Sequence, residues 1–245
     1  YSALIMIDNN LIAYRDYYGI TSLTLGSLKN DGGYILSSET CAIDALDGKF
    51  ISEINPGEII YLNNSEVKRE QLFEEKANKS CVFETIYTSR PDSLIKGESV
   101  YKKRFKAGKT LGEKNTLDAD VVIAAPDSGT VFAIGYAEGA KIPYGMGIVK
   151  NRYVGRTFGD KDAKSRETKV RIKLNVLREV VEDKVVILVD DSIVRGTTMK
   201  RTVKMVKDAG AKSVHVRIAS PMVFFDCKLG VNKSVTGQML AKSHS

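Results

Sequence analysis

Short apolar runs separated by turn-forming residues dominate the first part of the chain. The runs at 4–7 and 11–14 flank an Asp-Asn-Asn sequence at 8–10, an arrangement typical of a β-hairpin. An Asn-Pro-Gly turn at 55–57 precedes another apolar run. Residues 1–62 are therefore predicted to be β-rich. Further short strands are expected at residues 23–25, 34–36 and 59–62.

The pattern changes after residue 81 to strands that alternate with helices, which predicts a parallel α/β sheet. Between the two patterns, residues 63–80 are rich in Glu, Lys and Asn and show little apolar periodicity. We interpret them as a linker between two domains. In the second domain we expect strands at 121–125, 146–149 and 214–218, and a helix at 130–138 that ends at Gly139.

The clearest strand is the apolar run at 185–189. The helix after it places Met199, Val203 and Val206 on one face, which is the spacing of an amphipathic helix, and Gly210 closes it.

Composition changes this picture only by excluding classes of protein. The chain has 245 residues, of which 43% are apolar and 27% charged, as in an ordinary soluble globular protein. No apolar run approaches the roughly eighteen residues of a membrane span, and the start has no secretory signal. Two histidines without an HExxH sequence exclude a zinc hydrolase of that type. Because it begins with Tyr1, we interpret the chain as a fragment.

The cysteines indicate the compartment. Cys41, Cys81 and Cys227 form no CxxC pair and are odd in number. This argues against a secreted disulfide framework and favours a reducing environment, so we expect a cytoplasmic protein.

The net charge of +7 is concentrated in one segment. Residues 150–173 contain nine Lys or Arg against three acids, and this segment also carries Gly155 and Gly159. A basic loop in solvent would explain this, and so would a loop that folds over a small polyanion. The second interpretation is favoured by the residues around the 185–189 strand.

Two carboxylates, Asp190 and Asp191, follow that strand directly, and a Ser/Gly/Thr-containing loop to residue 198 then opens the helix. Ligands of open α/β sheets bind at the carboxyl ends of strands. Free N–H groups at a helix start suit a phosphate, and Gly196 allows the backbone to approach it closely. Paired carboxylates suit ribose hydroxyls or hydrated Mg²⁺. A surface Asp-Asp pair before an ordinary helix cap is the alternative, but the order of strand, acids, loop and cap is the order that one sugar-phosphate ligand needs.

The segment 185–198 resembles the phosphoribosyl-pyrophosphate (PRPP) binding signature of type I phosphoribosyltransferases. Its residues are similar to those of the amidophosphoribosyltransferase family. The resemblance is nearly continuous over 81–221 and looser upstream. The segments that carry it are 81–87, 89–93, 126–128, 134–138 and 150–158, with 15–20, 37–39 and 55–58 upstream.

This resemblance implies a type I phosphoribosyltransferase fold, a parallel sheet flanked by helices, over residues 81–221. Residues 1–62 would be the β-rich C-terminal part of an N-terminal-nucleophile (αββα) glutaminase domain, and 222–245 a diverged or truncated segment. The implied reaction forms 5-phosphoribosylamine from PRPP and glutamine-derived ammonia, releases pyrophosphate, and is the first committed step of purine synthesis.

The resemblance also implies roles for individual residues. Asp190, Asp191 and Lys150 would be catalytic, and Ser128 would join the two aspartates at Mg²⁺. Arg166, Arg171 and Lys173 would continue the basic segment. PRPP would be bound by Ser192, Ile193, Val194, Arg195, Gly196, Thr197 and Thr198, together with Arg152 and Arg156.

The sequence departs from the family at its cysteines. The family's glutaminase nucleophile is an N-terminal cysteine, whereas Cys41 is interpreted as a packed thiol, so we expect no glutamine hydrolysis and at most ammonia-dependent transfer. Some members hold a [4Fe–4S] cluster on four cysteines. Cys81 and Cys227 match the first two ligand positions, so a cluster is expected only in a full-length parent.

Two other functions remain open at this point. A nucleobase-salvage phosphoribosyltransferase would need neither the β-rich residues 1–62 nor the 150–158 segment. A non-catalytic PRPP-sensing regulator that binds nucleic acid would use the basic charge, but its concentration in one segment fits a small anionic substrate better. The resemblance implies as partners PRPP, glutamine or ammonia, purine nucleotide inhibitors and further copies of the chain, and we expect no nucleic acid and no membrane.

Overall fold

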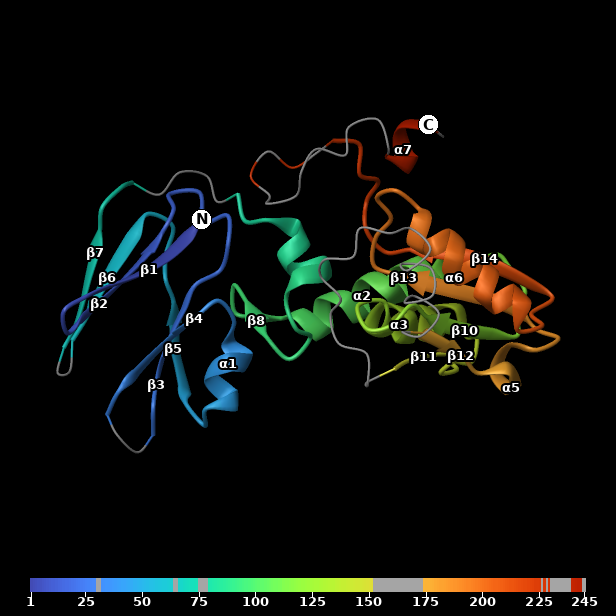
Figure 1. Ribbon diagram of the computed structural model, residues 1–245, viewed down its shortest axis with the longest axis horizontal. Helices are drawn as coiled ribbons and strands as arrows, with labels where there is room; N and C mark the ends of the chain where they lie inside the picture. Colours follow the sequence, from blue (N-terminus) through green and yellow to red (C-terminus); the bar gives the residue numbers. More distant parts are fainter. Residues whose placement is uncertain are drawn as a thin grey trace, which may run out of the picture. The chain divides into compact units, whose positions relative to one another are not determined.

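The computed structural model describes residues 1–29, 32–63, 66–74, 79–151, 174–225, 227, 229 and 239–243 (Figure 1). The chain divides into two compact units, Tyr1–Lys103 and Arg104–Ser245. The linker predicted at 63–80 stays a prediction.

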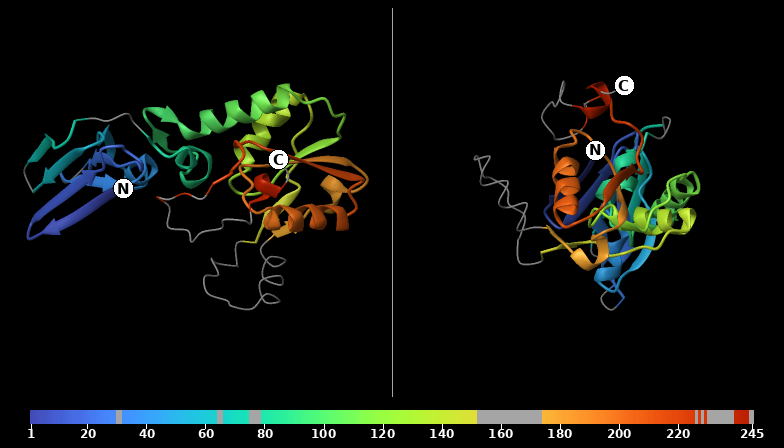
Figure 2. Two further views of the ribbon diagram at one scale, coloured as in Figure 1. Left: turned by 90° about the horizontal axis from the view of Figure 1, so that it is seen from above. Right: turned by 90° about the vertical axis from the view of Figure 1, so that its right-hand side faces the viewer.

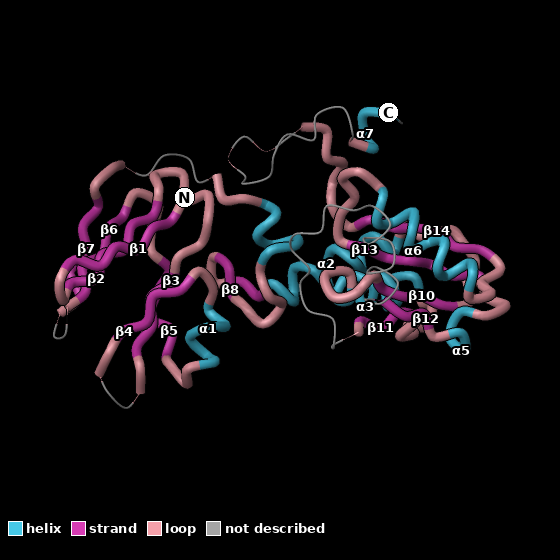
Figure 3. Tube along the Cα trace, in the orientation of Figure 1, coloured by secondary structure: helices cyan, strands magenta, loops and turns pink. Residues whose placement is uncertain are grey.

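The first unit is built from small antiparallel sheets with strand orders β1-β2-β6-β7, β4-β3-β5 and β8-β9 (Figure 3). The predicted hairpin is present, because Ile7 of β1 pairs with Asn10 of β2 across a two-residue turn. Asp8 in this turn has φ 50°, a left-handed conformation that Asp and Asn tolerate. The elements are β1 (Ser2–Ile7), β2 (Asn10–Arg15), β3 (Thr24–Ser27), β4 (Tyr34–Ser37), α1 (Thr40–Ala45), β5 (Lys49–Glu53), β6 (Glu58–Leu62), β7 (Val67–Gln71), the π-helical turn η1 (Glu84–Thr88), β8 (Leu94–Ile95) and β9 (Glu98–Ser99).

Strand β7 lies inside the segment interpreted as a linker, where it pairs with β6. Its residues after Val67 are all exposed, so no apolar alternation marks it in the sequence. The core of this unit instead comes from apolar residues such as Ala13 in β2, Ile60 in β6 and Ile54 just after β5, which are fully buried.

The second unit contains a parallel sheet with strand order β10-β13-β14. Its central strand, β13, is buried on both faces, since Val186, Ile187, Leu188 and Val189 all have 0% exposure. Burial on both faces explains the continuous apolar run in the sequence. The predicted α/β class with a parallel sheet is confirmed. The elements are α2 (Val100–Glu113), which begins before the unit boundary, β10 (Val121–Ala124), α3 (Thr130–Ala140), β11 (Ile148–Lys150), β12 (Leu174–Val176), α5 (Arg178–Val181), β13 (Val185–Asp190), α6 (Thr197–Asp208), β14 (Ser213–Ile218) and α7 (Leu240–Ser243).

Helices cover both faces of this sheet, with α3 on one face and α6 on the other (Figure 2). Met199 and Val206 of α6 belong to one core cluster with Val186 and Leu188 of β13. The predicted apolar face of this helix therefore packs on the sheet as expected, and α6 ends just before Gly210 (φ 100°).

Helix α3 packs on α2 through glycines. A Cβ at Gly135 would lie 2.1 Å from the Phe105 carbonyl oxygen, and one at Gly139 would lie 2.2 Å from that of Lys109. The two backbones are thus in direct contact, with no room for a side chain. The prediction that the helix ends at Gly139 was wrong, because this glycine serves helix packing and α3 continues to Ala140.

The strand predicted at 146–149 lies slightly later. Strand β11 begins at Ile148 and pairs antiparallel with β12. Upstream of it, Tyr144 forms an isolated parallel bridge with Val122 of β10, so the chain passes along the free side of β10 before β11. No helix in the described residues is both long and apolar enough to cross a membrane.

Candidate functional site

The parallel strands β10 and β13 lie side by side and send the chain in opposite directions. After β10 the chain returns beside that strand at Tyr144, whereas after β13 it returns as β14 on the far side. The loops that follow the two strands therefore diverge from one sheet edge. Such a switch point is where open α/β sheets form their ligand-binding crevice.

The two predicted acids lie at this edge. Asp190 ends β13 and is partly buried, while Asp191 is only 3% exposed. The main chain fixes both, because the N–H of Ala219 donates to the Asp190 carbonyl at 3.1 Å and that of Ser220 donates to the Asp191 carbonyl at 2.8 Å. This burial limits the hydration of the two carboxylates, and the hydrogen-bonded main chain holds them in position. They are therefore suited to a ligand that supplies positive charge or hydroxyl groups.

Burial and the neighbouring Asp191 raise the pKa of Asp190 to about 7. One internal hydrogen bond opposes this, since the Asp191 N–H donates to Asp190 Oδ1 at 2.8 Å. The Ser192 hydroxyl donates to Asp191 Oδ1. A cation beside the pair would favour the charged form of Asp190, which makes the pair suited to Mg²⁺ or to ribose hydroxyls.

The loop after the acids ends at the start of α6. Gly196 occupies the N-cap position with φ 75°, in the left-handed region that glycine adopts without strain. Thr197 and Thr198 in the first turn are exposed, and the N–H groups of this turn are those that a helix leaves without internal partners. Ile193 holds the loop down by packing against the core, and Arg195 is exposed. Free N–H groups at a helix start beside a glycine are features that suit a phosphate.

A residue from the C-terminal segment supports this loop. The sequence did not predict this contact. The N–H of Leu240 donates to the Val194 carbonyl at 2.9 Å. The position where a Cβ would stand on Gly196 is 3.5 Å from the Leu240 side chain. The sequence offers little signal for this contact, because the family resemblance fades after Pro221 and the pair Met239 and Leu240 is one of several apolar groups beyond it.

The loop after β10 touches the end of β13. A Cβ on Gly129 would lie 2.8 Å from the Val189 carbonyl oxygen and 3.1 Å from the Asp190 Cα. Ser128, the predicted third Mg²⁺ residue, precedes this glycine and is partly buried. The structure thus brings the Ser128 loop beside the acidic pair, without a direct Ser128–Asp190 hydrogen bond among the described contacts.

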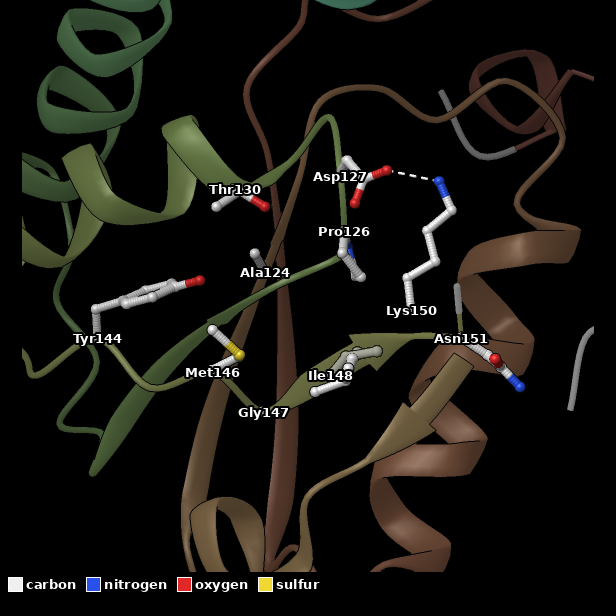
Figure 4. Close-up of a pocket in the computed structure, with 11 residues that line it drawn as sticks. Ala124, Pro126, Asp127, Thr130, Tyr144, Met146, Gly147, Ile148, Lys150 and Asn151 are labelled. Carbon is white, nitrogen blue, oxygen red and sulfur yellow. Dashed lines mark hydrogen bonds and ion pairs between the residues drawn. The ribbon is translucent and has the colours of Figure 1, made fainter. Parts of the chain in front are cut away.

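A pocket of about 490 Å³ adjoins this loop on the other side of β10 (Figure 4). Lys150 Nζ reaches across it to Asp127 Oδ2 at 2.6 Å. Burial raises the pKa of Tyr144, whose ring forms part of the apolar wall. The lining residues are Ala124, Pro126, Asp127, Thr130, Tyr144, Met146, Gly147, Ile148, Val149, Lys150 and Asn151.

The other predicted residues are not part of the arrangement described so far. Arg152 and Arg156 lie outside the described residues, as do Arg166, Arg171 and Lys173. Cys81, in the first unit, is partly buried, and Cys227, in the second, is exposed. Among the described residues no three His, Cys, Asp or Glu side chains gather to hold a metal. Two carboxylates still fit Mg²⁺, which proteins hold through one or two carboxylates together with substrate phosphates.

The profile of the Phosphoribosyl transferase domain family matches residues 88–222, more than half of the chain, and the chain belongs to this family. Within it, the chain is similar to an amidophosphoribosyltransferase of Archaeoglobus fulgidus, with 46% identity over 245 residues that cover all of this chain and 53% of the relative. It is similar to the amidophosphoribosyltransferase of Bacillus subtilis at 44% identity, over 100% of this chain and 51% of that protein.

The solved structure of the Bacillus subtilis glutamine PRPP amidotransferase, complexed with ADP and GMP, matches with a TM-score of 0.90 and 43% identity. The match covers 100% of this chain and 53% of the solved one. The predicted resemblance to amidophosphoribosyltransferases is confirmed, and the chain spans about half the length of the relatives that it matches.

Proposed function

We propose that this chain is the PRPP-binding, phosphoribosyl-transferring part of an amidophosphoribosyltransferase. The whole enzyme would form 5-phosphoribosylamine from PRPP and ammonia taken from glutamine, and would release pyrophosphate. The observation that carries the proposal is the acidic pair Asp190–Asp191 at a sheet switch point, followed by a left-handed glycine that opens α6. Relatives at 46% and 44% identity favour this function over base salvage or nucleic-acid regulation.

Each part of the site has a proposed role. Asp190 and Asp191 hold the ribose hydroxyls and, with Ser128, face the Mg²⁺ of the substrate; bound Mg²⁺ would offset the charge that grows on the departing pyrophosphate. The 5′-phosphate would lie on the loop of Ser192–Thr198, against the N–H groups of α6. Lys150, with Arg152 and Arg156, would neutralise the leaving group.

The ribose carbon that loses pyrophosphate gains positive character, and ammonia is already a good nucleophile. The protein therefore needs no strong base at this centre, and its main tasks are to position the ligand and to stabilise the leaving charge.

The remaining assignments rest on the family. We propose a cytoplasmic homo-oligomer that purine nucleotides inhibit. Cys81 and Cys227 provide two thiols, whereas a [4Fe–4S] cluster needs four, so a cluster would require further cysteines of a longer parent. Residues 1–62 would belong to the glutaminase part, and Cys41 is not proposed as its nucleophile.

The test is thermal unfolding with PRPP and Mg²⁺ at pH 8. The wild-type melting temperature should rise, because a ligand that binds the folded state stabilises it. Asp190→Asn combined with Asp191→Asn should abolish the rise, measured from the variant's own baseline. Asp208→Asn, an exposed residue paired with Lys204, should keep it. A wild-type melting curve that PRPP leaves unchanged would refute the site, and pyrophosphate release with ammonium as nitrogen donor would show turnover.

A further inference from the structure

One ion pair joins two of the elements that line the pocket beside β10. Asp127 comes from the loop after β10, and Lys150 is the last residue of β11. Their charged groups lie 2.6 Å apart, although the side chains are 72% and 52% exposed (Figure 4). The backbone of Lys150 is fixed, because β11 pairs with β12 through Lys150 and Leu174. Only the flexible side chains can exchange partners.

Within the described lining of this pocket, Asp127 is the only acid and Lys150 the only base. The other described residues of the lining are apolar or uncharged. An anion that enters the pocket meets a lysine whose charge is already neutralised by a carboxylate. It must displace that carboxylate and then lie close to it.

We propose that Asp127 is an internal counter-ion that competes with the diphosphate group for Lys150, and so limits the affinity of the site for pyrophosphate. This inference rests on the proposed function, because it takes the diphosphate of PRPP and free pyrophosphate as the ligands of Lys150. Its consequence is faster loss of the product, since Asp127 recaptures Lys150 as pyrophosphate departs.

The exposure of the pair sets the size of the effect. Ion pairs in contact with solvent are weak, so the contact tunes affinity and does not block the site. Replacing Asp127 removes both the competing partner and a negative charge beside the bound diphosphate. We therefore expect a gain in pyrophosphate affinity of about threefold to tenfold at low salt, which shrinks as salt screens the charges.

Isothermal titration calorimetry with sodium pyrophosphate tests this, on the wild type and on Asp127→Asn. Asp118→Asn is the matched control, because it removes the same charge from an exposed residue that precedes β10, at the other end of the strand. Asp127→Asn should bind more tightly, both in EDTA and with Mg²⁺, and Asp118→Asn should bind as the wild type does. Thermal melting of each variant confirms that it is folded.

A second background makes the test specific for Lys150. In Lys150→Met, the further change Asp127→Asn should give a clearly smaller gain than it gives beside Lys150. Equal gains in both backgrounds would overturn the proposal in favour of general charge repulsion. Weaker binding by Asp127→Asn with Mg²⁺ would overturn it too, because Asp127 would then help to hold the metal. Wild-type protein that binds no pyrophosphate would refute the proposed function itself, whereas wild-type binding without a gain in Asp127→Asn refutes this inference alone.

Discussion

The loops after β10 and after β13 share one edge of the sheet, and each opens a helix, but glycine has a different task in each. Gly196 before α6 has φ 75° and room around it, whereas Gly129 before α3 has φ −71° and backbone within 2.8 Å of the Cβ position. The first glycine is needed for its conformation and the second for its size. The loop at Gly196 leaves space where a ligand could bind, whereas the loop at Gly129 packs directly against the end of β13.

The charges differ in the same way. Asp191 after β13 is buried and the main chain of both acids is hydrogen-bonded, whereas Asp127 after β10 is exposed and paired with the exposed side chain of Lys150. Buried, fixed charges are pre-organised for a ligand at a cost in stability. Exposed charges cost little and can change partners. The same edge of the sheet thus carries two acids held in place by the main chain and one exposed ion pair that can change partners.

The largest effect is expected from Gly129→Ala. Its methyl group would overlap the carbonyl oxygens of Ala125 and Val189, and neither strand end can move without breaking the sheet. We expect the free energy of unfolding to fall by roughly 2–3 kcal/mol. Urea unfolding measures this, and Gly97→Ala, at a glycine with open space around it, shows the separate cost of an unsuited φ. A loss below that of Gly97→Ala would contradict the close contact of the loops.

A smaller, pH-dependent effect is expected from Asp190→Asn. Burial and the charge of Asp191 raise the pKa of Asp190 from 3.8 to about 7, so the folded state holds a proton that the unfolded state releases between these values. Wild-type stability therefore falls as the pH rises through this window. Asp190→Asn should exceed the wild type by about 1–2 kcal/mol at pH 8 and equal it near pH 4.

Urea unfolding of both proteins across pH 4–8 measures this difference, with Asp118→Asn as the exposed control. A difference that stays constant with pH would show that Asp190 is not the group that titrates. Because the charged form binds a cation, PRPP with Mg²⁺ should also bind the wild type more tightly at pH 8 than at pH 6.

The smallest effect on stability is expected from Gly196→Ala, about 1 kcal/mol, because only the backbone conformation is penalised. Binding should suffer more than folding, since the displaced peptide lies in the phosphate loop. Calorimetry should show a loss of PRPP affinity of about tenfold, given that one imperfectly placed charged hydrogen bond costs about 1.5–3 kcal/mol. Unchanged affinity in a destabilised variant would show that this glycine serves only the fold.

Much of the second unit could be predicted from the sequence because its signals are local. The apolar run of β13, the acids that follow and the periodicity of α6 are each contained in a few consecutive residues. Strand β7 could not be found, because exposed polar residues form it and its partner β6 defines it. The contact between α2 and α3 was also missed, since glycines spaced along two helices carry no apolar signal.

The candidate site divides in the same way. Asp190, Asp191 and the loop to Thr198 follow a strand that the sequence marks clearly, and their order in the chain predicted a site at its end. Ser128 was assigned through the family resemblance, and the structure places its loop beside the same strand end. The pairing of Asp127 with Lys150 joins residues that are 23 positions apart in the chain, and it depends on where Tyr144 leaves β10. Such contacts are properties of the tertiary fold, which neither periodicity nor a motif encodes.

The contact of Leu240 with the loop before α6 has a practical consequence. The family profile ends at residue 222, so an expression clone trimmed to that boundary would retain the complete motif from strand to helix. It would nevertheless lack the backbone N–H that meets the Val194 carbonyl and the leucine beside Gly196. Domain limits drawn from motif similarity can therefore remove a support of the very loop that defines them.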